Sequence, residues 1–142
     1  MSVQIKNVPK LTYVGAKAIL EAAAQKAKEM KLPITIAVAD DGGHLLVFAR
    51  MEDAKPSSAR VAITKAASAA LRRAATGPLP SGENTSVLLS LGMPLASGGS
   101  LTCVRGGLPI VWEGATIGGI GVSAGTEAQD EEIARAGLGG LR

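Results

Sequence analysis

The fold is decided by one unbroken stretch, Gly106–Gly125 (GGLPIVWEGATIGGIGVSAG), which continues into an acidic segment that ends at Gly137. It contains two mainly apolar runs, 108–113 and 115–123, which meet at the pair Glu113-Gly114. This pattern predicts a β-hairpin, because glycine adopts the positive φ that a tight turn requires. Glycines inside the second run weaken a strand, so they indicate a place where a helix, a backbone or a ligand approaches closely. We expect close helix packing as the first explanation and the wall of a shallow pocket as the second.

Hydrophobic periodicity predicts the remaining elements. We expect a second hairpin at Asp40–Gly43, because its two glycines suit a tight turn. Most of the predicted strands follow one another through hairpins and do not alternate with helices. This order predicts the α+β class, with a mainly antiparallel five-stranded sheet and helices packed on it. No linker or repeat divides the chain, so we expect a single domain over residues 1–142. The predicted helices span 12–31, 58–73, 84–91 and 126–137, and the predicted strands span 34–39, 44–50, 101–105, 108–113 and 115–123.

The composition restricts the class of protein. Hydrophobic residues make up 46% of the chain but aromatic residues only 2%, so the core consists of small side chains that bury little area each. We therefore expect a homo-oligomer, which buries further apolar surface. The net charge of +3 is scattered, and the pair Arg72-Arg73 has no aromatic neighbour, which argues against nucleic-acid binding. No segment has the pattern of a signal peptide or a membrane span, so we expect a cytoplasmic protein.

Several segments match one known family in the family's own order. On these segments the chain resembles the GlcG/HbpS-like family, which is related to the C-terminal domain of PduO-type proteins. The resemblance covers nearly the whole chain, and it implies a profilin-like α/β/α arrangement and a dimer or higher assembly. The matching segments are Ala37–Leu46, Arg50–Asp53, Ser58–Ala66, Gly106–Val111, Ile117–Ser123 and Asp130–Ala134.

The same resemblance implies two classes of function. Some members of the family bind haem or are linked to corrinoid metabolism, so we expect a small-ligand-binding protein whose ligand is haem or a corrinoid-related cofactor. Other members serve the catabolism of small organic acids. These imply, as the alternative, a small enzyme that hydrolyses, deaminates or tautomerises such an acid. A third interpretation is an oligomeric accessory protein without chemistry of its own.

His44 is the only imidazole of the chain and follows the turn of the first hairpin. Histidine binds metals readily, so His44 is the candidate metal ligand and the candidate axial ligand of a haem iron. It is also a candidate general base. No carboxylate stands at a spacing that would orient the ring, so we favour the alternative of an exposed histidine at the start of a strand. No cluster of His, Cys, Asp and Glu has the spacing of a zinc site.

Arg50 and Lys65 are the candidates for carboxylate binding and proton transfer. The guanidinium of Arg50 suits a carboxylate or a haem propionate, and an ion pair with Glu52, Asp53 or the final helix is equally compatible with the sequence. Lys65 lies among small residues of the second predicted helix, so its stem is partly desolvated, which would suit acid–base or Schiff-base chemistry. The commoner outcome is a lysine that reaches water. The family resemblance favours the functional role for Lys65.

The start of the final helix supplies the other candidates. Asp130 and Glu131 are candidate partners of Lys65 in proton transfer, although acidic residues in a first turn already stabilise the helix dipole. Backbone amides at this helix start could instead hold an anion. Whether the corner of residues 123–131 faces a pocket shared with Arg50 and Lys65 is the question for the structure. The candidate ligand-binding residues around this corner are Gly107, Gly121, Ser123 and Gly125.

Overall fold

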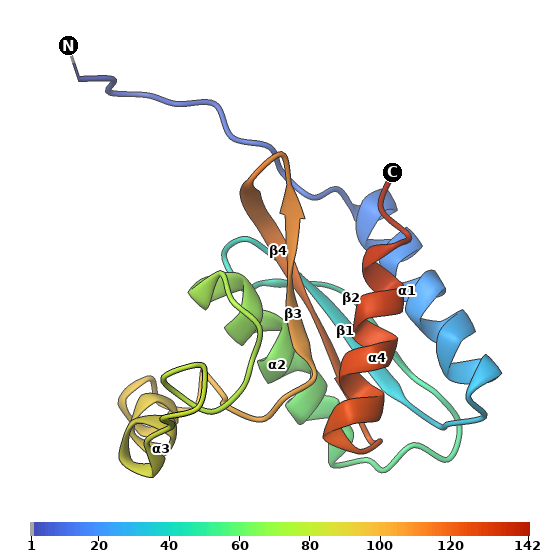
Figure 1. The fold of residues 1–142 in the computed structure, drawn as a ribbon. Helices are drawn as coiled ribbons and strands as arrows, with labels where there is room; N and C mark the ends of the chain where they lie inside the picture. The colour runs from blue at the N-terminus through green and yellow to red at the C-terminus, as the bar shows by residue number, and fades with distance from the viewer. Residues whose placement is uncertain (1) are drawn as a thin grey trace.

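The computed structural model describes residues 2–142. Its elements follow in the order α1 (Tyr13–Glu29), β1 (Thr35–Asp40), β2 (Leu45–Arg50), α2 (Ser58–Arg72), α3 (Val87–Ala96), β3 (Gly107–Trp112), β4 (Ala115–Ser123) and α4 (Glu127–Leu138). Helix α2 covers one face of the sheet, and α1 and α4 lie side by side on the other face (Figure 1). The expected α+β class and the packing of helices on an antiparallel sheet are therefore confirmed.

The sheet within residues 2–142 has four strands in the order β2-β1-β4-β3, and every neighbouring pair is antiparallel. The prediction of a five-stranded sheet, with a strand over residues 101–105, is wrong. The backbone there bonds to side chains in place of a neighbouring strand. The hydroxyl of Ser68 accepts from Thr102 N and donates to Thr102 O, and Arg105 N donates to the carboxylate of Glu127. The apolar run that indicated a strand is therefore a loop tied to α2 and α4.

The short helix predicted over residues 84–91 begins later and extends further, as α3. The side chain of Ser86 caps it by accepting a hydrogen bond from Leu89 N at 3.1 Å. The helix then continues through Pro94, whose missing N–H removes one backbone donor near the end of the helix. The predicted helix ended at residue 91, before Gly92 and Pro94, but the structure includes both residues in α3. Among the helices of the described residues, none combines the length and the apolar character that crossing a bilayer requires.

The two faces of the sheet are packed by different kinds of side chain. The face under α1 and α4 buries larger aliphatic residues such as Ile36, Val38 and Ile120. The face under α2 buries mainly alanines, and a Cβ atom at Gly119 or Gly121 of β4 would collide with backbone oxygens of α2. The glycines of β4 therefore let α2 lie close on the strand, which confirms helix packing as their first explanation.

Candidate functional site

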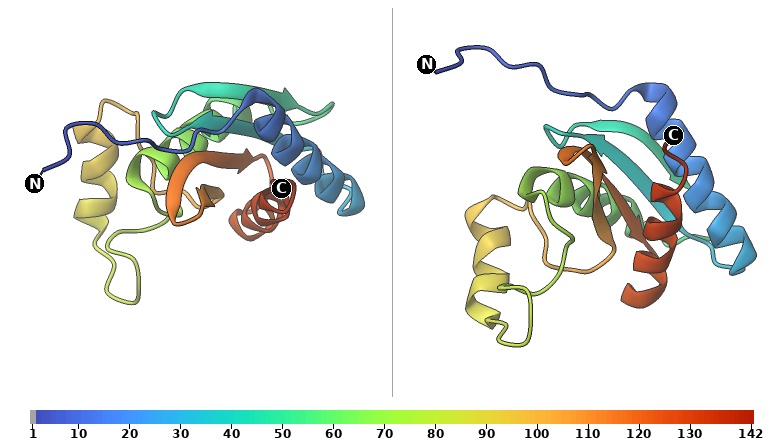
Figure 2. Two further views of the ribbon diagram at one scale, coloured as in Figure 1. Left: turned by 90° about the horizontal axis from the view of Figure 1, so that it is seen from above. Right: turned by 45° about the horizontal axis from the view of Figure 1, so that its top comes forward.

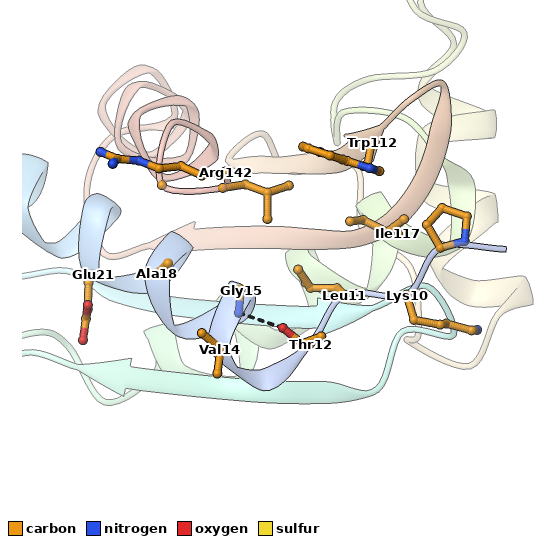
Figure 3. Close-up of a pocket in the computed structure, with 13 residues that line it drawn as sticks. Lys10, Leu11, Thr12, Val14, Gly15, Ala18, Glu21, Trp112, Ile117 and Arg142 are labelled. Carbon is orange, nitrogen blue, oxygen red and sulfur yellow. Dashed lines mark hydrogen bonds between the residues drawn. The ribbon is translucent and has the colours of Figure 1, made fainter.

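A groove opens beside the start of α1, between this helix, the β3–β4 hairpin and the C-terminal residues (Figure 3). Its volume is about 650 Å³, the largest of three cavities described within residues 2–142. Small-molecule sites have volumes of about 300–1,000 Å³. The apolar lining of the groove includes Leu11, Trp112, Ile117 and Leu141. The groove therefore has the size and the lining of a site for a small, largely apolar ligand.

Glycines bring the walls of this groove together. A Cβ at Gly15 of α1 would lie 3.0 Å from Leu11 Cδ1 and 3.5 Å from Leu141 Cδ1. Gly140 seats the C-terminal segment on α1, because a Cβ there would collide with a carbonyl oxygen of that helix. Leu11 is thereby buried in the lining, with 8% of its surface exposed. A larger residue at Gly140 would therefore push the C-terminal segment away from α1, and one at Gly15 would crowd the side chain of Leu11.

Two cationic side chains, Lys10 and Arg142, lie towards opposite ends of the groove (Figure 3). Lys10 Nζ lies 2.8 Å from Asp41 Oδ2. The hydrogen bond from Lys10 holds the pKa of the Asp41 carboxyl below its ordinary value. Arg142 forms no ion pair with any residue from 2 to 142. Its guanidinium is therefore the better placed of the two cations to bind a carboxylate of a ligand, which it can do through two N–H groups.

Lys65 and Asp130 form an ion pair in the interior, between α2, β4 and α4. Lys65 Nζ donates to Asp130 Oδ2 at 3.2 Å and to the carbonyl oxygen of Val122 at 2.8 Å. The other oxygen of the carboxylate accepts from Gly125 N at 2.9 Å. The side chains of Lys65 and Asp130 are 2% and 3% exposed. The lysine therefore does not reach water, which was the commoner outcome considered from the sequence.

Burial raises the pKa of the Asp130 carboxyl above its ordinary value, and the attraction of the Lys65 ammonium opposes that rise. Gly106 lies directly against the pair. Its φ is +124°, and a Cβ at this position would lie 2.7 Å from Lys65 Nζ. Neither Lys65 nor Asp130 lines any of the three cavities described within residues 2–142. The pair joins three elements of the fold, and the proton-transfer role expected for it stays a prediction.

Glu131, the third residue expected to transfer protons, lies on the surface side of α4. Arg105 Nε donates to one of its carboxylate oxygens at 3.0 Å, and Arg135 Nη2 donates to the other at 3.2 Å. The hydrogen bond to this carboxylate raises the pKa of the Arg105 guanidinium. Of the two acidic candidates, the structure therefore brings only Asp130 to Lys65.

Arg50 and Ser123 lie at the same end of the sheet as the buried pair. Thr35 of β1 stands opposite both Arg50 of β2 and Ser123 of β4. Arg50 Nη1 donates to the carbonyl oxygen of Ala54 at 3.1 Å. Within residues 2–142 it forms none of the ion pairs considered from the sequence. The corner of residues 123–131 contacts the buried lysine, but none of the three described cavities joins this corner to Arg50.

His44 lies at the opposite end of the sheet. His44 comes four residues after Asp40, at the far side of the β1–β2 turn. Asp40 pairs with Gly118 near the start of β4, whereas Ser123 is the last residue of that strand. A rise of about 3.4 Å per residue puts about 17 Å between these two positions of β4. His44 is exposed and lines none of the three described cavities. No group of three or more His, Cys, Asp and Glu side chains within residues 2–142 is arranged to hold a metal ion.

The expected ligand-binding glycines lie in closely packed places, and their role in ligand binding stays a prediction. A Cβ at Gly107 or Gly121 would press on backbone oxygens of α2, and a Cβ at Gly125 would lie 2.8 Å from Asp130 Oδ1. Sequence reasoning missed the groove, because Leu11, Trp112 and the C-terminal residues lie far apart along the chain. It also missed the contact of Gly106 with the buried pair, although the double glycine at 106–107 was a signal of close approach.

Comparison with known proteins identifies the relatives of the chain. A family model described as haem degrading protein HbpS-like matches residues 11–139. The chain is 40% identical to Protein GlcG of Escherichia coli over 113 residues, which cover 80% of this chain and 81% of the relative. Both comparisons agree with the resemblance seen in the sequence.

Two solved structures have the same fold. The first is Klebsiella pneumoniae protein ORFY, with a TM-score of 0.86 and 28% sequence identity, covering 99% of this chain and 96% of that chain. The second is a complex of PduOC with haem, with a TM-score of 0.83 and 26% identity, covering 94% of this chain and 96% of that chain. These comparisons extend over nearly the full length of both partners.

Proposed function

This chain belongs to the HbpS-like family, and we propose that it binds haem in the groove beside α1. The observation that carries the proposal is the groove, a largely apolar cavity of about 650 Å³ that contains the only tryptophan of the chain. The description of the family and that of one solved neighbour both name haem. These two descriptions are the reason for preferring haem to a corrinoid-related cofactor as the ligand.

The chemistry of the groove suits both parts of haem. The apolar lining and the ring of Trp112 suit the faces of a porphyrin. The two propionates leave the macrocycle on one edge, so we assign one end of the groove to them. That end is Arg142, because Lys10 at the other end is already held by Asp41.

The groove does not supply a ligand for the iron. None of its lining residues is a His, Cys, Met or Tyr, the side chains that hold haem iron in proteins. His44 remains the candidate axial ligand from the sequence, but it lies outside the groove, so the two are rival sites. We favour the groove because it offers an apolar surface to the ligand, whereas His44 lines none of the three described cavities, and we propose that His44 is not required for affinity. Bound haem would supply the redox chemistry of its iron, and the residues of the groove would hold the macrocycle through apolar contacts.

The alternative of a small organic-acid enzyme receives no support from the geometry. Its expected acid–base residues, Lys65 and Asp130, bind each other in the interior and line none of the three described cavities. Its expected carboxylate-binding residue, Arg50, donates to the carbonyl oxygen of Ala54. A substrate would have no described space in which to meet all three side chains.

A haemin titration followed by the Soret band tests the proposal. We expect saturable binding at one haem per chain. Arg142→Gln should weaken the affinity by about two- to fivefold, because an ion pair between partly exposed groups contributes about 1 kcal/mol or less. Lys10→Gln should weaken it less, because this side chain is bound to Asp41.

The matched control is Arg60→Gln, which removes an exposed arginine of α2 that lines none of the described cavities. Its affinity should equal that of the wild type. The absence of a saturable spectral change in the wild type would contradict haem binding altogether. Loss of binding in His44→Ala, with Arg142→Gln unchanged, would place the site at the β1–β2 turn and contradict the assignment to the groove.

A further inference from the structure

A second cavity lies between the end of α2, the loop that follows it and the segment before β3. Its volume is about 310 Å³, at the lower end of the range for small-molecule sites. Within the described part of the chain, it shares no lining residue with the groove beside α1. Both views in Figure 2 show the yellow-green connection from α2 to α3 extending outward from the body of the protein. The cavity lies along this connection, over residues 74–85.

The lining of this cavity, within residues 2–142, carries two positive charges and no negative charge. The charged residues are Arg72, at the end of α2, and Arg105, before β3. Like charges that share a small cavity repel each other, so an anion bound between them would relieve the repulsion. The cavity therefore favours a negatively charged ligand. Its lining also supplies three hydroxyl groups, those of Thr76, Ser81 and Thr85.

Both guanidinium groups keep hydrogen-bond donors for a ligand. Arg72 is only partly exposed, yet its side chain donates no hydrogen bond and forms no ion pair within residues 2–142. Arg105 Nε donates to Glu131 Oε2 at 3.0 Å, which fixes the side chain and leaves the two terminal nitrogens of the guanidinium for other partners. A Cβ at Gly77 would lie 3.6 Å from Arg105 Cγ, so the stem of this arginine lies along the loop.

The loop that forms one wall of the cavity is fixed by hydrogen bonds. Thr76 N donates to Gly107 O and Gly107 N donates to Thr76 Oγ1, both at 2.9 Å. Leu79 N donates to Ser90 Oγ at 2.8 Å, and Ser86 N donates to Leu79 O at 2.6 Å. Thr76 and Leu79 are buried, with 5% and 8% of their surfaces exposed. The cavity is therefore formed before a ligand arrives, which lowers the cost of ordering the loop on binding.

We propose that this cavity binds a small ligand through its phosphate group, which Arg72 and Arg105 hold between them. Guanidinium groups bind phosphate through paired N–H donors. Two of them balance the two charges of a phosphate monoester, whereas a carboxylate balances only one. A tetrahedral phosphate also accepts hydrogen bonds from several directions, which suits hydroxyl groups spread over the lining. Among the described residues the lining includes no aromatic side chain on which a base could stack, so the cavity does not suit a nucleic acid.

Two-dimensional NMR of the isotope-labelled full chain, titrated with inorganic phosphate and with methyl phosphate, tests this site. No haem is added, and the ionic strength is constant at about pH 8, where a phosphate monoester carries two charges. Saturable shifts should appear at the backbone amides of residues 76–85 and of Arg105. Binding of both ligands is the expected result, and the one that binds more tightly shows whether the cavity takes free phosphate or an ester. Acetate should bind roughly tenfold more weakly, because it carries one charge and two oxygens.

Substitution of Arg72 separates the cavity from general electrostatics. Arg72→Gln should weaken phosphate binding by roughly fivefold or more, because it removes a charge together with its paired donors. Its far-UV circular dichroism should match that of the wild type, because the side chain bonds to no partner within residues 2–142. Arg72→Lys should recover part of the lost affinity, since it keeps the charge without the paired donors. The matched control is Arg73→Gln, which removes the same charge one residue further along, from a side chain that lines a different cavity, and its affinity should equal that of the wild type.

Several results would overturn the proposal. One is the absence of saturable shifts with both phosphate ligands, and another is shifts centred on the groove beside α1 or on Arg73. Acetate that binds as tightly as phosphate would also contradict it, as would equal weakening in Arg72→Gln and Arg73→Gln, because positive charge in general would then explain the binding. None of these results depends on whether the chain binds haem, so the two proposals stand or fall separately.

Discussion

Lys65→Met and Asp130→Asn each leave one member of the buried ion pair without its partner. The two side chains are 2% and 3% exposed, and Lys65 Nζ lies 3.2 Å from Asp130 Oδ2. Breaking a buried pair by removing one partner costs about 3–5 kcal/mol, because the remaining charge stays in the interior without compensation. Removing both charges is often nearly neutral, because the cost of burying them disappears too. We therefore expect a loss of about 3 kcal/mol for each single variant and about 1 kcal/mol or less for Lys65→Met/Asp130→Asn.

Urea unfolding measures these losses when the emission of Trp112, the only tryptophan, is followed together with circular dichroism. For a chain of this size, a loss of 3 kcal/mol corresponds to a decrease of roughly 10 °C in Tm. Lys26→Met is the matched control, since it removes a lysine from an ion pair of 3.7 Å whose side chains are 33% and 57% exposed, and it should lose less than about 1 kcal/mol. If the loss in the double variant equals the sum of the two single losses, the pair is not coupled and the reasoning fails.

The pH dependence supplies a second test of the same pair. Burial raises the pKa of Asp130 in the folded state, so the folded protein binds this proton more tightly than the unfolded chain does. The stabilisation that this provides is present below the unfolded pKa of 3.8 and is lost as the pH rises through the folded pKa. In Lys65→Met the opposing attraction of the ammonium is absent, so the folded pKa rises further. The stability of this variant should therefore fall more steeply with rising pH than that of the wild type, and equal slopes would contradict the assignment.

The remaining predictions concern close packing and capping. Gly121→Ala should lower the free energy of unfolding by more than about 2 kcal/mol, because its Cβ would collide with the carbonyl oxygen of Ala62 and displace α2; unchanged urea unfolding would contradict this. Gly106→Ala should be similarly destabilising, since its φ is +124° and its Cβ would lie 2.7 Å from both Lys65 Nζ and the carbonyl oxygen of Val122; a midpoint of urea unfolding equal to that of the wild type would refute this. Thr126→Ala should cost about 1 kcal/mol, because it removes the capping box at the start of α4, and thermal unfolding that matches the wild type would show that the cap contributes nothing.

Local signals in the sequence predicted most of the fold. The Glu-Gly pair predicted the position of the β3–β4 hairpin, and the last helix was predicted from residue 126, where the structure has a capping box formed by Thr126 and Gln129. The fifth strand was wrong because an apolar run does not show whether its backbone bonds to a strand or to the side chain of a residue such as Ser68. Such pairings are set by tertiary structure, which a local pattern does not contain.

The site was harder to predict than the fold. The sequence singled out Lys65 and Asp130 separately, but no spacing rule joins residues 65 positions apart. The groove combines Leu11, Trp112 and Arg142, which come from the beginning, the last hairpin and the end of the chain. A hydrophobic residue in each of these segments looks ordinary by itself, and only the packing of α1 against the C-terminal segment brings them to one surface.

Quenching of Trp112 fluorescence by haemin tests the central claim most directly, because this single tryptophan lines the groove. If haem binds there, quenching should saturate at one haem per chain, follow the growth of the Soret band, and persist in His44→Ala. Free N-acetyltryptophanamide at the same absorbance corrects for light absorbed by haemin itself. A Soret band that grows while the corrected emission of Trp112 stays constant would contradict the account, because haem would then bind away from the groove.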